Sequence, residues 1–183
     1  MRTIDQIDDL FDLLATGGGA AYFGEPVTVL EHSLQAAWFV QRKGAADTLI
    51  AAGLLHDLGH LLHSEGADAA QRGLDTRHEE LAAQLLRGHV ADAVLDPIRL
   101  HVAAKRYLCA IDPSYLASLS AASKESLTLQ GGPMSGAEGE AFLALPHAQD
   151  AVVLRHADDA AKVNGLRVPE LATYRPLIER LWS

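Results

Sequence analysis

The chain has 183 residues, enough for one domain with a sizeable core, and its 49% hydrophobic and 21% charged content is typical of globular proteins. A net charge of −9 with 15 basic residues argues against nucleic-acid binding, which needs a clustered positive surface. No apolar run reaches the roughly 18 residues of a membrane span, and the acidic, amphipathic N-terminus is unlike a signal peptide. We therefore expect no membrane partner and a cytoplasmic location. The single cysteine, Cys109, excludes an internal disulfide framework and a cysteine-based zinc site.

Apolar residues recur at helical spacing in nearly every segment, and no long alternation of β-branched residues favours a strand. We therefore predict an all-α protein, with residues 1–183 forming a single domain. Glycine and proline mark the breaks, as in Gly17–Gly19 after the first predicted helix and Pro169 before the last. In chain order the predicted helices cover residues 3–15, 28–43, 45–62, 76–88, 91–108, 112–118, 120–129, 135–144, 147–162 and 170–182.

Residues 53–60, GLLHDLGH, place two histidines and an aspartate in the third predicted helix, which is otherwise apolar. Burying such groups is costly unless each finds a partner. On a helix, His56 and His60 would share one face, with Asp57 beside His56. A lone buried histidine is more often a satisfied core residue, but three such groups within five residues indicate a metal site. Nitrogen and oxygen ligands suit zinc, iron or manganese.

The further candidate ligands are single polar residues of other predicted helices: His32, His78, His101 and Asp158. Lys105 follows His101 by one turn, and Arg155 precedes Asp158 by three residues. Each candidate alone also has a structural interpretation, for example a solvated helix face at Asp158 and Asp159. The other histidines, His63, His89, His147 and His156, have no second ligand at helical spacing, and we exclude them.

The order of these residues resembles the HD-domain superfamily, in which core helices supply an H…HD…D pattern to a metal. The matching residues are His32, His56, Asp57 and Asp158. The intervening His78 and His101 resemble the extra ligands of dinuclear HD proteins, in which Asp57 would bridge two metals. Six ligands on five helices fit two ions better than one. The resemblance thus implies that the single domain, residues 1–183, is an HD domain.

A narrower resemblance extends over nearly the whole chain. It is carried by YFGE at 22–25, LEHSLQ at 30–35, LLHDLGH at 54–60, HVAAKRYL at 101–108, the serine of LSAAS at 119–123, QGGPM at 130–134 and LRHAD at 154–158. These motifs are similar to those of small HD-domain oxygenases that cleave carbon–phosphorus bonds in 1-hydroxyphosphonates. The resemblance implies a mixed-valent Fe(II)/Fe(III) centre that uses dioxygen. It also implies a small-molecule substrate, either 2-amino-1-hydroxyethylphosphonate, giving glycine and phosphate, or its trimethylammonio analogue, giving glycine betaine.

The resemblance also implies a role for each matching residue. The implied iron ligands are His32, His56, Asp57, His78, His101 and Asp158, and the implied phosphonate contacts are His60, Lys105, Ser123 and Arg155. Among these, we expect Asp57, His60 and Lys105 to be catalytic. Tyr22 and Glu25 match a gating pair, in which the tyrosine ligates an iron without substrate and the glutamate meets the substrate amine. The charges of Lys105 and Arg155 suit a phosphonate anion held beside the metals.

Two other classes of function stay open from the sequence. A metal-dependent phosphohydrolase would use nearly the same ligands to direct a metal-bound hydroxide at a phosphate ester. The Tyr22–Glu25 segment, the contexts of Lys105 and Ser123, and the short chain argue against it. A non-catalytic HD domain would have no need for six buried polar ligands. Among the oxygenase substrates, hydroxymethylphosphonate is a further alternative that would make Glu25 superfluous.

Overall fold

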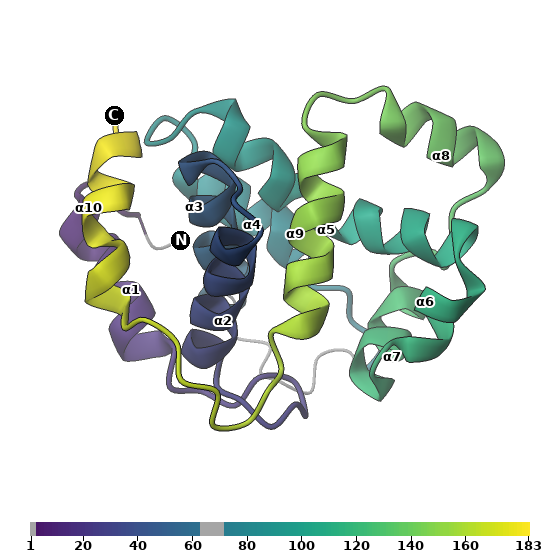
Figure 1. Ribbon diagram of the computed structural model, residues 1–183, viewed down its shortest axis with the longest axis horizontal. Coiled ribbons are helices and arrows are strands. Elements are labelled where there is room, and N and C mark those ends of the chain that lie inside the picture. Colours follow the sequence, from purple (N-terminus) through teal and green to yellow (C-terminus); the bar gives the residue numbers. More distant parts are fainter. Residues whose placement is uncertain (1–2, 63–71) are drawn as a thin grey trace.

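The computed structural model describes residues 3–62 and 72–183, and these ranges form an all-helical fold without strands, as predicted (Figure 1). The elements are α1 (Ile7–Gly17), α2 (Val29–Arg42), α3 (Asp47–Leu55), the 3-10 helix η1 (Leu58–Leu61), α4 (His78–Leu86), α5 (Asp92–Ile111), α6 (Pro113–Ser118), α7 (Ala121–Leu129), α8 (Gly136–Leu143), α9 (Ala148–Ala160) and α10 (Leu171–Leu181). Within the described ranges, no helix is both long and apolar enough to cross a bilayer.

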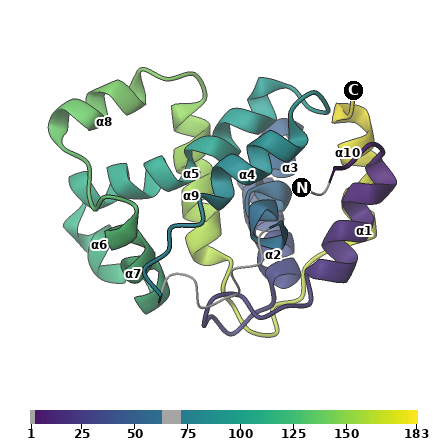
Figure 2. The same cartoon turned by 180° about the vertical axis from the view of Figure 1, so that it is seen from behind.

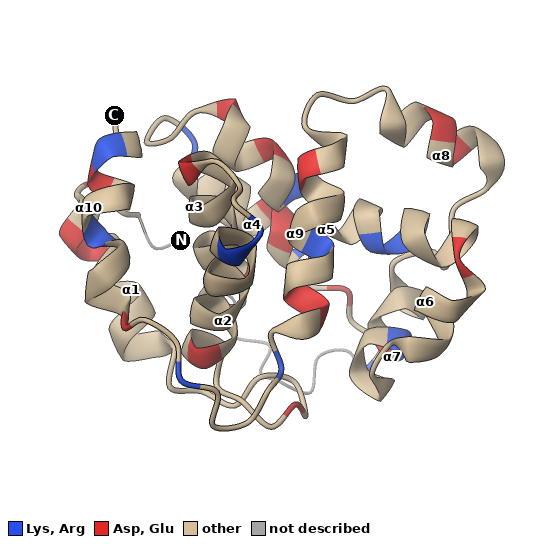
Figure 3. Ribbon diagram, viewed as in Figure 1, with Lys and Arg blue, Asp and Glu red and all other residues tan. Residues whose placement is uncertain are grey.

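The centre of the fold is a packed group of four helices, α2, α3, α5 and α9. Helix α5 packs against α9, α3 and α4, while α2 packs against α3 and α9. Both ribbon views place α1 and α10 together on one side of this group and α6, α7 and α8 on the other (Figures 1 and 2). In the view of Figure 3, basic residues are spread along the helices with acidic residues between them.

Small residues let α2 and α3 approach each other closely. Ala36 and Ala37 on α2 are fully buried, and a Cβ added to Gly53 of α3 would lie 3.1 Å from the Cα of Ala37. Every residue of α3 from Leu49 to Leu55 is buried, because the other central helices and α10 surround it. This close packing holds the end of α3 beside α2, where the first polar residues of the site lie.

The prediction of one continuous helix over 45–62 is wrong. Helix α3 ends at Leu55, Asp57 has φ −99° and ψ 11°, and η1 begins at Leu58. The physical reason lies at Gly59, where the place of an added Cβ is already taken by the carbonyl of His78. The backbone turns here so that the start of α4 can pack directly against η1. The other predicted helices are confirmed, with ends that differ by a few residues.

Candidate metal centre

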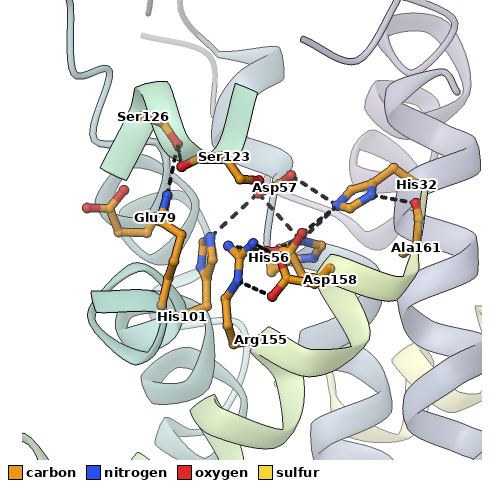
Figure 4. A network of polar contacts seen from close by, with 12 residues as sticks. His32, His56, Asp57, Glu79, His101, Ser123, Ser126, Arg155, Asp158 and Ala161 are labelled. Carbon is orange, nitrogen blue, oxygen red and sulfur yellow. Dashed lines mark hydrogen bonds and ion pairs between the residues drawn. The ribbon is translucent and has the colours of Figure 1, made fainter. Parts of the chain in front are cut away.

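Buried polar residues from five parts of the chain meet at the centre of the helical group. His32 lies on α2, His78 is the first residue of α4, His101 lies on α5 and Asp158 on α9. Figure 4 shows His32, His101 and Asp158 arranged around Asp57, in the turn after α3, together with His56. The structure therefore brings together all six residues that the sequence indicated as ligands: His32, His56, Asp57, His78, His101 and Asp158.

One group of donor atoms is formed by His32, His56 and Asp57. The Nε2 atoms of His32 and His56 lie 3.2 Å apart. Asp57 Oδ2 lies 3.4 Å from Nε2 of His32, and Asp57 Oδ1 lies 3.5 Å from Nε2 of His56. Asp158 adds a further carboxylate, with Oδ1 3.3 Å from Nε2 of His32. Two imidazoles and two carboxylates thus point at one small volume.

A second group is formed by Asp57, His78 and His101. The Nε2 atoms of the two histidines lie 3.0 Å apart, and Asp57 Oδ1 lies 3.4 Å from His78 and 3.7 Å from His101. Asp57 therefore belongs to both groups. A carboxylate in this position has the geometry needed to bridge two metal ions.

The outer nitrogens of three histidines are held by backbone carbonyls, which can only accept hydrogen bonds. Nδ1 of His32 donates to the carbonyl of Ala161 at 2.8 Å, that of His56 to Gly53 at 2.9 Å, and that of His101 to Ile98 at 2.7 Å. When such an imidazole is neutral, its proton is on Nδ1 and its Nε2 has a lone pair for a metal.

The protonation states of the buried groups follow from their surroundings. Burial lowers the pKa of His101 to about 4, so this imidazole is neutral at pH 7. Burial alone would raise the pKa of Asp158, but the nearby Arg155 guanidinium outweighs it and holds that pKa well below the ordinary value. Burial would lower the pKa of His32, but its interactions with the carboxylates of Asp158 and Asp57 outweigh burial and raise this pKa to about 9. The ionised carboxylates of Asp57 and Asp158 would attract a metal cation, which would replace the proton on His32.

The donor set fits metal ions. Asp158 Oδ1 is buried and has no hydrogen-bond partner, which is costly for a carboxylate oxygen unless a cation meets it. Two imidazole nitrogens bound at about 2.0–2.1 Å to one ion, at a right angle, lie roughly 3 Å apart. The two histidine pairs, at 3.2 and 3.0 Å, match this spacing. Nitrogen and oxygen donors without thiolate suit iron, manganese or zinc.

A cavity of about 300 Å³ opens beside the centre, and Asp57, His78, His101 and Asp158 form its inner wall. The residues indicated by the sequence as substrate contacts all line the same cavity: Tyr22, Glu25, His60, Lys105, Ser123 and Arg155. A small anion in this cavity would lie next to the metal-binding groups and to several cationic side chains.

The aromatic residues beside the cavity pack on the ligand histidines. The Tyr22 hydroxyl donates to Asp57 Oδ2 at 2.6 Å, and its ring stacks on His32 with centroids 4.0 Å apart. The His60 ring stacks on His78 at 4.0 Å and contacts Phe23 at 4.1 Å. His60 Nε2 lies 3.9 Å from Asp57 Oδ1. The prediction that His56 and His60 share one face of a helix is wrong, because α3 ends at Leu55 and His60 reaches the cavity from η1.

Lys105 and Ser123 line the cavity but have different partners. Lys105 is 2% exposed, and its Nζ donates to Ser126 Oγ at 2.8 Å. Ser123 Oγ instead accepts a hydrogen bond from Lys162 Nζ at 2.9 Å. Burial, together with the charge of Arg155, lowers the pKa of Lys105 to about 7. Any anion that bound beside this ammonium would stabilise its charged form.

Arg155 forms ion pairs with the carboxylates of Asp158 and Asp159. Its Nη1 lies 2.7 Å from Asp158 Oδ2, and its Nε donates to Asp159 Oδ2 at 3.0 Å. Nη2 also contacts Asp159, while the Tyr115 hydroxyl donates to Asp159 at 2.5 Å. This network fixes the orientation of Asp158. The expected contact of Arg155 with a phosphonate stays a prediction.

Sequence reasoning missed Lys162, Ser126 and the Tyr115–Asp159 pair. Lys162 follows Asp158 by four residues, a spacing that could have suggested the same side, but α9 ends before it. Ser126 follows Ser123 by three residues on α7, a spacing that places both on one helical face. Tyr115 lies 40 residues from Arg155 along the chain, so no local pattern connects them.

Three excluded histidines have other surroundings. His89 stacks on Trp182, His147 forms an ion pair with Asp150, and His156 meets the edge of Tyr115. None of the three belongs to the two metal-binding groups found among the described residues. The fourth, His63, lies outside the residues that the structure describes.

The fold is all-helical in the described ranges, and its two linked histidine–aspartate groups could each hold a metal ion. The sequence pattern of the HD domain matches residues 29–126, and the chain belongs to the HD-domain family. The chain is 44% identical, over 96% of its length and 87% of the relative, to a hydroxymethylphosphonate dioxygenase of Gimesia maris. It is 37% identical, over 97% of its length and 89% of the relative, to the glycine-betaine-forming [1-hydroxy-2-(trimethylamino)ethyl]phosphonate dioxygenase of Leisingera caerulea. An uncharacterized protein of Acanthamoeba polyphaga mimivirus is 32% identical over 97% of this chain and 82% of its own length.

Proposed function

We propose that the protein is a diiron dioxygenase that cleaves the carbon–phosphorus bond of a 1-hydroxyphosphonate, releasing phosphate and a carboxylic acid. The observation that carries this proposal is Asp57, which is shared by two groups of metal-binding donors at the wall of a cavity of about 300 Å³. The similarity to two hydroxyphosphonate dioxygenases over nearly the whole chain supports the reaction.

The proposed ligands are the six residues of the centre. His32, His56 and Asp158 would hold one ion, His78 and His101 the other, and Asp57 both. When bound, an Fe(II)/Fe(III) pair would supply the oxidising chemistry with dioxygen and a charged template for the substrate oxygens. The chain's part is to fix the ligand positions, to bind the phosphonate and to orient it.

Lys105, in the cavity wall, would neutralise the charge of the phosphonate. Its ammonium is already desolvated and positioned by Ser126, so little side-chain entropy remains to be lost when an anion binds. His60, stacked on His78, would direct a ring N–H to a phosphonate oxygen, and the Ser123 hydroxyl would donate another hydrogen bond.

Tyr22 would act as a cover over the centre. Its hydroxyl meets Asp57 and its ring lies flat on His32, so the tyrosine occupies the space between cavity and ligands. A substrate that reached the metals would have to displace this hydroxyl from Asp57. We therefore assign Tyr22 a gating role.

The overall reaction balances without water. A 1-hydroxyphosphonate and one O2 contain the atoms of a carboxylic acid and phosphoric acid. The C–P, C1–H and O–O bonds break, and one new C–O bond, one new P–O bond and one new O–H bond form; the carbon is oxidised and dioxygen is reduced.

The test is aerobic incubation of the iron-loaded protein with hydroxymethylphosphonate, 2-amino-1-hydroxyethylphosphonate and its trimethylammonio analogue in separate reactions. We expect phosphate release matched by oxygen uptake with at least one of them. Phosphate esters serve as the comparison. Phosphate released from esters alone, with no oxygen consumed, would contradict the proposal and indicate a phosphohydrolase.

A further inference from the structure

Lys162 joins two residues of the cavity wall. It is the second residue after α9, and its Nζ lies 3.4 Å from Glu25 Oε1 and donates to Ser123 Oγ at 2.9 Å. The side chains of Lys162 and Glu25 are only 13% and 12% exposed, and both line the cavity. The ion pair therefore lies within the cavity, partly removed from water.

The pairing determines what Glu25 can bind. Its Oε1 is buried and accepts no hydrogen bond, so the charge of Lys162 is the balancing interaction for this carboxylate. Asp75 and Glu125 also line the cavity but are exposed side chains. Apart from the metal-binding aspartates, the described residues that line the cavity thus include one poorly exposed carboxylate, and a lysine is already paired with it.

We propose that Lys162 is a specificity-determining residue: by pairing with Glu25 it favours a 1-hydroxyphosphonate without a cationic substituent over one that carries an ammonium group. This inference rests on the proposed function. The candidate substrates share the phosphonate and the C1 hydroxyl and differ in whether C1 carries only hydrogen, an aminomethyl group or a trimethylammoniomethyl group.

The reason is electrostatic. A cationic substituent that leaves water needs an anionic partner, and the carboxylate available for it already carries a cation. The new cation would meet the repulsion of Lys162 as well as the attraction of Glu25. Hydroxymethylphosphonate presents no cation, so it does not meet this repulsion.

The experiment compares four forms of the iron-loaded protein: wild type, Lys162→Met, Glu25→Gln and the double variant. For each, kcat/KM is measured from phosphate release with hydroxymethylphosphonate and with 2-amino-1-hydroxyethylphosphonate. The wild type should prefer hydroxymethylphosphonate. Lys162→Met frees Glu25 and should shift the ratio of kcat/KM values toward the amino compound by about tenfold or more, a size typical of one desolvated charge contact.

The double variant makes the test specific to the ion pair. If freed Glu25 causes the shift, Lys162→Met together with Glu25→Gln should lose it, because the carboxylate that would bind the ammonium group is then missing. Glu25→Gln alone should give no gain with the amino compound. Calorimetric titration without oxygen measures Kd in the absence of turnover. For each form of the protein, the ratio of the Kd values for the two substrates should show the same preference as the ratio of kcat/KM values.

Controls separate specificity from folding. Lys43→Met removes an exposed lysine at the end of α2 and should leave the ratio unchanged. Iron content and the unfolding temperature are measured for every form, and Lys162→Gln replaces Lys162→Met if the methionine variant is unstable.

Two results would overturn the inference while leaving the proposed function intact. One is an equal loss with both substrates in Lys162→Met, which would make Lys162 a phosphonate contact. The other is a wild type that prefers the amino compound. Failure of the wild type to release phosphate from any hydroxyphosphonate would instead overturn the proposed function, and this inference with it.

Discussion

Asp57 makes the two metal-binding groups one centre. Its Oδ1 lies 3.4 Å from Nε2 of His78 and 3.5 Å from that of His56, while Oδ2 faces His32. Burial would raise the pKa of Asp57, but the surrounding imidazoles, first His56 and His60, outweigh it and keep this pKa well below the ordinary value. The carboxylate is ionised and available to two cations.

Asp57→Ala should therefore remove both ions rather than one. We expect a loss of metal affinity larger than the roughly 10–100-fold typical of removing an outer partner of a ligand, and no turnover. Iron content after desalting measures this directly. Asp96→Ala, which removes a partly buried ion pair with Arg99 on α5, is the control and should retain iron. A metal-replete, active Asp57→Ala would contradict the bridging role.

Lys105 makes phosphonate binding depend on pH. Because burial lowers its pKa to about 7, the ammonium form is lost as pH rises above this value. Affinity for the anion should fall between pH 7 and 9, by at most about tenfold per pH unit if binding requires the charge. Titrations of the phosphonate without oxygen, at a series of pH values, measure this affinity. Lys105→Arg stays charged and should lose this dependence; the same slope in both proteins would exclude Lys105 as its cause.

At the scale of elements, the contact between η1 and the start of α4 positions the second group of the centre, formed by Asp57, His78 and His101. Gly59 lies against the backbone of His78, and this contact sets the distance between Asp57 and the second histidine pair. A side chain of any size at residue 59 would push α4 away.

Gly59→Ala should consequently destabilise the protein by about 2–3 kcal/mol, the usual cost of overpacking, and weaken binding of the second ion. Urea unfolding and iron content measure the two effects. Gly19→Ala is the matched control, since a Cβ there has no neighbour within 4 Å. Equal stability of both variants would contradict the close packing of η1 on α4.

The element scale also shows what the sequence could establish. Helical periodicity predicts the helices, because each needs an apolar face toward the core. Residue type and order indicate the six candidate ligands, which the fold brings together. The break at His56 was not predictable, because the run LIAAGLLHDLGHLL stays apolar through the turn and the cause is a tertiary contact with α4. The Lys162–Glu25 pair was not predictable either, because it is also a tertiary contact, between residues 137 positions apart in the chain (162 − 25).

On the scale of the whole molecule, the centre connects segments that are distant in sequence. His32 on α2 and Asp158 on α9 belong to one end of it, and His78 and His101 to the other. Bound metals would thus cross-link α2, α4, α5 and α9, and their binding free energy would add to folding stability.

Fe(II) added without oxygen should accordingly raise the unfolding temperature. A free concentration 100 times Kd contributes about 2.7 kcal/mol per site, which corresponds to roughly 5–10 °C for a chain of this size. Circular dichroism during heating measures the shift, and Asp57→Ala should show little of it. An unchanged unfolding temperature in the wild type would mean that the ion does not bind the folded centre.

The most direct test of the central claim is turnover under 18O2 in ordinary water, followed by mass spectrometry of the phosphate and the carboxylic acid. Dioxygenase chemistry at the Asp57-bridged centre predicts that oxygen from O2 enters the products. Products that take up oxygen only from water, as shown by the reciprocal experiment in H2 18O, would contradict the account and assign the centre to hydrolysis.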